Sequence, residues 1–177
     1  SGSKSYAGDT AVFGGSLSVS SDSNLGAGAL TLNGGTLNLI ADGVHIDNAI
    51  SVFSNNGQIN VGANVTATLS GVVSGSGSLT KVGDGTLALS GTQTGTGEMS
   101  IIAGILSVAG DANLLAGALT LNGGALSVTG ASTIDNAIAL GSLGGRVINT
   151  DAVTLSGELS GTGSLSKDGA GTLTLSG

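Results

Sequence analysis

Residues 77–91 read GSLTKVGDGTLALSG, and the same pattern returns as GSLSKDGAGTLTLSG at residues 163–177. On both sides of the central glycines, apolar residues alternate with polar ones, which predicts two short β-strands joined by a turn. The second copy keeps the leucines and the glycines, whereas Asp84 is replaced by alanine. The conserved leucines and glycines are the residues that a strand–turn–strand corner requires. The aspartate that a bound cation would require is not conserved between the two copies.

The repetition extends well beyond these two stretches. DSNLGAGALTLNGGTLNL at residues 22–39 matches DANLLAGALTLNGGALSV at residues 111–128, and HIDNAI at 45–50 matches TIDNAI at 133–138. The offset between matching residues falls from 89 to 86 along the chain, as small deletions in turns would produce. Such self-similarity is the sequence signature of repeat architectures.

We therefore expect a single segment, residues 1–177, made of two similar units at 5–93 and 94–177. Residues 1–4 fit a remnant of an expression vector. Within each unit, apolar residues alternate with a period of two, and similar strand pairs return at intervals of about twenty residues, a length that fits one coil. The expected strands include Leu17/Val19, Leu37/Leu39, Ile59/Val61, Leu87/Leu89, Leu106/Val108 and Leu173/Leu175.

Two all-β architectures compete for this pattern: an antiparallel sandwich or barrel, and a parallel β-solenoid. A sandwich normally anchors its core with bulky aromatics, but aromatic residues make up 2% of this chain. A narrow core that accepts the same shape coil after coil suits Leu, Ile and Val. The sequence predicts a right-handed parallel β-helix of about eight coils, its hand following from the usual hand of parallel crossovers.

Composition and charge exclude several classes of function. Eleven acidic residues against four basic ones give a net charge of −7, which opposes binding to nucleic acid or to an anionic membrane surface. No apolar run approaches the length of a membrane helix, so no membrane insertion by this segment is expected. The absence of cysteine excludes a disulfide framework and cysteine-based metal sites.

The motif around residues 75–91 resembles the passenger-associated repeat of bacterial autotransporters. It reads G-x-G-x-L-x-K-x-G-x-G-x-L-x-L-[ST]-G and continues as T-x-T-G at 92–95 and I-x-A-G-x-L at 101–106. Residues 161–177 match the first part again. The chain departs from the family pattern at Gly95, where an aromatic residue is frequent.

The resemblance implies a β-helical passenger that crosses the periplasm and the outer membrane and is displayed on the bacterial cell surface or released. The implied partners are the remainder of a longer passenger chain and its C-terminal outer-membrane barrel. A barrel domain, a signal peptide and a protease triad are not recognisable in these 177 residues, so we expect an internal piece of such a passenger.

The glycines of 77–91 invite comparison with two ligand-binding motifs. A phosphate-binding loop places its lysine after the glycines and opens a helix, whereas Lys81 precedes Gly83 and a strand follows. Calcium-binding repeats require tandem nonapeptides with aspartates, and Asp84 is not kept. We expect Gly83 and Gly85 to adopt positive φ in the turn. Lys81 and its counterpart Lys167 fall on the inward phase of their strands, and we expect them to reach the surface from strand ends.

The remaining candidates also have structural interpretations. His45 is the only histidine, and it is expected to face solvent. Asp47-Asn48 recurs as Asp135-Asn136, which points to hydrogen bonding in a repeated turn rather than to a unique active site. No catalytic, cofactor-binding or metal-binding residue and no cofactor is therefore predicted.

Three functions remain open from the sequence alone. The leading hypothesis is a non-enzymatic stalk segment that gives a secreted passenger length and rigidity and assists its translocation and folding. The second is an adhesin or self-association surface on the same β-helix, formed by exposed columns of Ser, Thr and Asn. The third is a polysaccharide-active enzyme, but its paired carboxylates would have to face each other across one bond, and the acids here are scattered.

Overall fold

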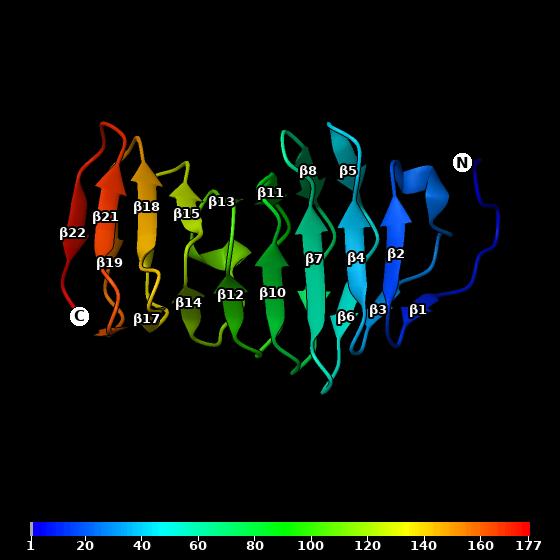
Figure 1. The fold of residues 1–177 in the computed structure, drawn as a ribbon, viewed down its shortest axis with the longest axis horizontal. Helices are drawn as coiled ribbons and strands as arrows, with labels where there is room; N and C mark the ends of the chain where they lie inside the picture. The colour runs from blue at the N-terminus through cyan, green and yellow to red at the C-terminus, as the bar shows by residue number, and fades with distance from the viewer. Residues whose placement is uncertain (1) are drawn as a thin grey trace.

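The computed structural model describes residues 2–177 and shows a rod built from short strands. The strands run across the long axis, and the two termini lie at opposite ends of the rod (Figure 1). Every strand pair is parallel and joins successive coils. The predicted parallel β-solenoid of about eight coils is therefore confirmed.

Each coil visits three sides of the rod in a fixed order. The first side is an eight-stranded sheet, β2 (Ser16–Val19), β4 (Thr36–Leu39), β7 (Gly57–Val61), β10 (Leu79–Val82), β12 (Met99–Ile101), β14 (Leu119–Leu121), β17 (Ile138–Leu140) and β20 (Leu159–Gly161). The second side is a seven-stranded sheet, β5 (Val44–Ile46), β8 (Thr66–Leu69), β11 (Thr86–Leu89), β13 (Ile105–Val108), β15 (Ala125–Val128), β18 (Gly145–Asn149) and β21 (Leu165–Asp168).

The third side is divided into two sheets. Toward the N-terminus lie β1 (Thr10–Val12), β3 (Leu30–Leu32), β6 (Ile50–Val52) and β9 (Val73–Ser74), and toward the C-terminus lie β16 (Ser132–Ile134), β19 (Val153–Leu155) and β22 (Leu173–Leu175). Within residues 2–177 the helical segments are two short 3-10 turns, η1 (Asp22–Asn24) and η2 (Asp111–Asn113). The chain is thus all-β, as its period-two alternation predicts.

The core is a set of aliphatic columns that run through the coils. Burial alternates along the strands, because successive side chains of a strand point to opposite faces of the sheet. The register places Ile59 opposite Lys81, and Leu79 opposite Gly57. One core column therefore reads Leu17, Leu37, Ile59, Lys81, Ile101, Leu121 and Leu140.

Strands with matching sequence lie on different sides of the rod. The segment LTL at β3 belongs to the third side, whereas the identical LTL at β14 belongs to the first side. In the same way β4 is on the first side and its counterpart β15 on the second, and β5 is on the second side and β16 on the third. Matching sequences are thus rotated about the long axis by one side.

Coil length explains this rotation. Four coils from Leu17 end at Ile101, 84 residues further along the chain. The matching residue lies 89 positions away, at Leu106, and the extra five residues carry the chain around one corner to the next side. The two sequences are compatible with either side, because each side presents the same kind of aliphatic column to the core.

Candidate functional site

The stretch 77–91 forms β10, a corner and β11. Gly83 adopts a φ of +77°, as expected for this turn, but Gly85 does not adopt a positive φ. The role predicted for Gly85 is therefore wrong. A Cβ atom on Gly85 would lie 2.2 Å from the carbonyl oxygen of Gly62 in the preceding coil, so this position requires glycine for close approach rather than for conformation.

Lys81 lies inside the core instead of reaching the surface, which corrects the expectation from its strand position. Only 2% of the residue is exposed. Its ammonium Nζ donates to the carbonyl oxygens of Val82 at 3.0 Å, Gly83 at 2.7 Å and Ala103 at 3.2 Å. An ammonium group has three protons and no acceptor, so three carbonyls match its donors. The lysine joins its own corner to the next coil.

Burial also changes the acidity of this lysine. Desolvation lowers the pKa of Lys81 to about 8, while the negative charge of Asp84 opposes this decrease. Its counterpart Lys167 lies in the last coil, is exposed, and donates to the carbonyl oxygen of Gly169. The same residue in the same motif is therefore buried when a coil lies above it and exposed when none does.

His45 is exposed, as predicted, and its Nε2 lies 2.7 Å from the hydroxyl of Ser70. The recurring Asp-Asn pairs have a structural role. Asn48 is buried, and its Nδ2 donates to the carbonyl oxygens of Gly26 at 2.8 Å and Gly28 at 2.7 Å in the preceding coil. Asn136 makes the equivalent bonds to Leu115 and Gly117.

The Asp-Asn pairs also anchor the two 3-10 turns. The backbone N–H of Asp47 donates to Asp22 of η1, and the backbone N–H of Asp135 donates to Asp111 of η2. Both copies thus use the same bonds although they lie on different sides of the rod. The turn interpretation accounts for these hydrogen bonds, although the buried Oδ1 of Asn48 has no hydrogen-bond partner.

Sequence reasoning missed a further buried amide. Asn149 is 1% exposed, and its Nδ2 donates to the carbonyl oxygens of Asp151 at 2.7 Å and Thr172 at 2.9 Å. Its counterpart in the first unit is Val61, which is fully buried in the core. The sequence did contain a signal for this amide: Asn149 falls at an inward position of its strand, where the other unit has an apolar residue.

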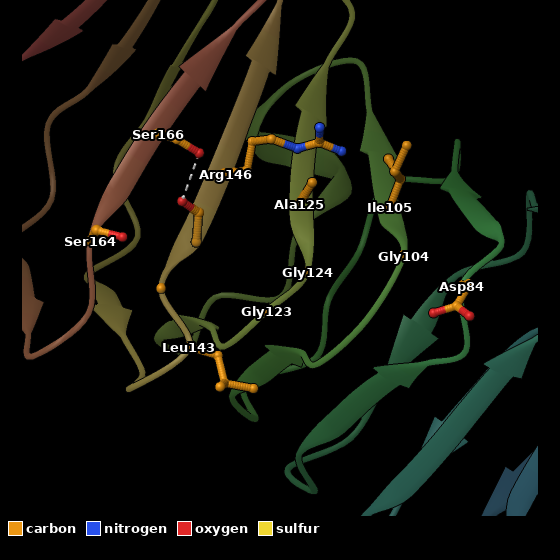
Figure 2. A pocket seen from close by; sticks show the side chains of 12 residues that line it. Asp84, Gly104, Ile105, Gly123, Gly124, Ala125, Leu143, Arg146, Ser164 and Ser166 are labelled. Atoms are coloured by element: carbon orange, nitrogen blue, oxygen red, sulfur yellow. Dashed lines mark hydrogen bonds between the residues drawn. The ribbon is translucent and has the colours of Figure 1, made fainter.

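Two shallow grooves follow the corners of the rod. One of about 370 Å³ on the second side is lined by the starts of β13, β15, β18 and β21, and Figure 2 shows Ile105, Ala125, Arg146 and Ser166 on these strands. The other, of about 730 Å³, lies on the first side along β2, β4 and β7 and is bounded by Val82 and Gly83, where β10 ends.

The two grooves are counterparts, but their side chains differ. Ser16, Thr36 and Gln58 in the first correspond to Ile105, Ala125 and Arg146 in the second. Arg146 forms an exposed ion pair with Asp168 at 3.1 Å. What both grooves share is a line of corner glycines without side chains, so we interpret them as products of the coil geometry. Across residues 2–177, no three His, Cys, Asp or Glu residues gather as a metal centre would require.

Comparisons with known proteins agree with this repeat geometry. The passenger-associated-transport-repeat family matches residues 79–108 and 165–177. The chain is also 39% identical over 110 residues to the adhesin BmaC autotransporter of Brucella suis biovar 1 (strain 1330), a match that covers 60% of this chain and 3% of that protein. No solved structure matches the chain, and no helix in the described residues is long and apolar enough to cross a membrane.

The matched residues include the corner that carries Lys81 and the coil that covers it. The lysine, the corner glycines and the inward leucines of the family pattern are thus the residues that hold one coil on the next. The chain carries passenger-associated transport repeats at residues 79–108 and 165–177, and its similarity to an autotransporter adhesin supports the resemblance to autotransporter passengers.

Proposed function

We propose that this chain is a stalk segment of an autotransporter passenger, with a structural rather than an enzymatic role. The observation that carries the proposal is the continuity of the core: one hydrophobic cluster runs through the coils, and the parallel ladder of the first side extends from β2 to β20 without a break for a cleft. Such a rod gives a displayed passenger length and rigidity. Its two units, residues 5–93 and 94–177, act as interchangeable lengths of rod.

The same continuity supports a role in secretion. The stability of a solenoid is approximately a sum of coil terms and nearest-neighbour interface terms. Coils that emerge outside the cell fold one by one on those already folded, which opposes backward movement through the outer membrane. The partners in this function are the remainder of the passenger chain and its outer-membrane barrel, and the location is the cell surface.

An adhesive surface is the second candidate, because the relative BmaC is named an adhesin. Outward-facing polar side chains on the first side provide surface for contact with a receptor or glycan: Ser18 is exposed, and Thr36, Asn38, Gln58 and Asn60 are half-buried. The stalk proposal and the adhesive proposal predict different results when coils are removed.

Deletion of whole coils in the full-length passenger tests the stalk function. Residues 79–98 form one coil, since Leu79 lies opposite Met99, so their deletion preserves the order of the sides. We expect normal display on the cell surface and unchanged binding of cells. Deletion of residues 79–84 is the control: it removes one strand of one coil, shifts every later strand to the wrong side and should reduce display.

Deletion of residues 37–58 also removes one whole coil, since Leu37 lies opposite Ile59, and it takes away Asn38 and Gln58. Normal display with lost binding after this deletion would favour the adhesive surface over the stalk. Loss of display after this whole-coil deletion would contradict the proposal that coils are interchangeable.

A further inference from the structure

The only two phenylalanines of the chain lie on one corner of the rod. Strands β1, β3 and β6 are in register, so the residues that follow them, Phe13, Asn33 and Phe53, form a column where the third side leads into the first (Figure 1). Phe13 is 72% exposed and Phe53 is 52% exposed. A phenylalanine ring normally adds a large apolar area to a core. Two exposed rings on one column therefore indicate a contact surface.

This column lies on the lateral surface of the rod. Asn33 and Phe53 precede strands β4 and β7, and each of these strands pairs with a neighbouring coil on both sides. Phe53 follows Val52, which is 1% exposed, and successive side chains of a strand point to opposite faces. The exposure of Phe53 therefore results from its outward direction and does not depend on the coils at either end of the chain.

Asparagine side chains on the same corner are held in position by the next coil. The Oδ1 of Asn33 accepts from the backbone N–H of Asn55 at 3.1 Å, and the Oδ1 of Asn56 accepts from the backbone N–H of Ser78 at 2.9 Å. Because the oxygen of each amide is used in this way, its Nδ2 remains as the donor for a ligand. A hollow of about 220 Å³ adjoins Asn55 and Asn56.

The corner carries no charge. None of residues 13–16, 33–36, 53–58 and 75–80 is acidic or basic. Phosphates and sulfated glycans are bound through Lys and Arg side chains, so they have no partner here. Exposed rings, amide donors and the lack of charge fit a neutral ligand that has apolar C–H faces and many hydroxyl groups. A neutral sugar chain has this chemistry.

We propose that this corner, formed by Phe13, Asn33, Phe53, Asn55 and Asn56, binds a neutral β-1,4-linked glycan that lies along the rod. Coils are spaced by about 4.8 Å, so the two phenylalanines are roughly 10 Å apart. In an extended β-1,4-linked chain every second sugar turns the same face to one side, at a similar spacing. The weakly positive C–H groups of that face stack on the negative face of each ring, and Asn33 lies beside the sugar between them.

The second unit supports a role of these residues beyond coil stacking. Its coils stack in the same way, but Ile102, Gly141, Leu143 and Gly144 stand where the first unit has the two rings and the two following asparagines. Asn122, the counterpart of the asparagine between the rings, keeps the hydrogen bond to the next coil. The rings are therefore not needed to hold one coil on the next, and a ligand accounts for them.

The proposal rests on the adhesive candidate for the function and is independent of the stalk role. Phe13→Ala and Phe53→Ala each remove one ring from the surface. Asn33→Asp keeps the oxygen that accepts from Asn55 and removes the Nδ2 donor. Leu143→Ala is the matched control, because this side chain is 72% exposed at the corresponding corner of the second unit.

Isothermal titration calorimetry of the purified chain tests the site with three hexasaccharides. Cellohexaose and chitohexaose are extended and β-1,4-linked, whereas maltohexaose is α-1,4-linked and curved, so its sugars do not repeat at the spacing of the rings. We expect binding of one or both β-1,4-linked probes and none of maltohexaose. Each ring variant and Asn33→Asp should weaken binding about fivefold, with Leu143→Ala and all circular dichroism spectra unchanged. Failure of both β-1,4-linked probes to bind, equal binding of maltohexaose, or an equal loss in Leu143→Ala would overturn the proposal.

Display of the full-length passenger on bacteria separates the failure of this site from the failure of the adhesive function. Binding of cells that either β-1,4-linked probe inhibits and that Phe53→Ala reduces supports both. Binding of cells that persists in Phe53→Ala and is not inhibited overturns the glycan site and leaves the adhesive function in place. If the passenger binds no cells while the purified chain binds the probes, the glycan site stands and the adhesive function is refuted.

Discussion

At the scale of single residues, Lys81 illustrates how one motif gives two environments. Its three carbonyl partners come from its own corner and from Ala103 in the next coil. Removing a buried donor leaves acceptors unsatisfied, which costs about 1–3 kcal/mol. We expect Lys81→Met to lower the free energy of unfolding by that amount, measured by urea denaturation.

Lys167→Met is the matched control for this substitution, because the same residue of the same motif is exposed in the last coil. The change in its free energy of unfolding should stay within about 0.5 kcal/mol, as for most surface substitutions. Equal effects of the two substitutions would contradict a burial-dependent role of Lys81.

The lowered pKa of Lys81 predicts a dependence of stability on pH. The folded protein releases this proton near pH 8, whereas a lysine in the unfolded chain releases it near pH 10.5. Between these values the unfolded chain binds more protons, so the free energy of unfolding rises with pH. The gain is complete above the unfolded value and is lost as the pH falls through 8. The stability of the wild type relative to Lys81→Met should increase across this window, and a constant difference would argue against it.

Lys81 also shows which features of the site the sequence predicts and which it does not. Alternation from Leu79 correctly places Lys81 on the inward phase of its strand, but the usual exposure of lysine favoured the surface. The carbonyls that make burial tolerable belong to a corner and to a second coil, and no local pattern reveals them. Asn48 was easier to interpret, since its recurrence in both units indicated a structural hydrogen bond.

At the scale of strands and corners, glycine is required for two separable reasons. Gly77 does not have a positive φ, but a Cβ atom there would lie 1.8 Å from the carbonyl oxygen of Phe53. Gly43 has a φ of +71° and open space around it. We expect Gly77→Ala to cost about 3 kcal/mol through forced displacement of the neighbouring coil. Gly43→Ala should cost about 1 kcal/mol from the left-handed backbone alone.

Thermal and urea unfolding of the two alanine variants measure this difference. A Gly43→Ala cost as large as that of Gly77→Ala would mean that backbone conformation, rather than the close approach of coils, sets the need for glycine.

The strand pattern itself was predictable, because period-two alternation and glycine turns mark the elements directly. The rotation between the two units was not predicted, although its signal is present in the sequence. An offset of 86–89 residues is not a whole number of coils of about twenty residues. The exact register that places Ile59 opposite Lys81 depends on turn lengths, which vary between coils.

At the scale of the whole molecule, stability should vary along the rod. In a solenoid each coil contacts only its neighbours, so an interior coil has two interfaces and a terminal coil has one. The inward side chains of β10–β14 are buried, whereas those of β20–β22 are half-buried or exposed. We expect the backbone amides of β20–β22 to exchange hydrogen at least about tenfold faster than those of β10–β14 in dilute solution, since a difference of 1.4 kcal/mol in opening free energy corresponds to tenfold.

Hydrogen exchange measured by mass spectrometry on the monomer tests this gradient. The second unit offers an internal control: β21 and β22 resemble β10 and β11 in sequence, so after correction for intrinsic exchange rates the difference between them reports position in the rod. Uniform exchange along the chain would mean that the eight coils open as one cooperative unit. In that case the coil-by-coil folding proposed for secretion would lose its energetic basis, because no coil would be stable before the others had formed.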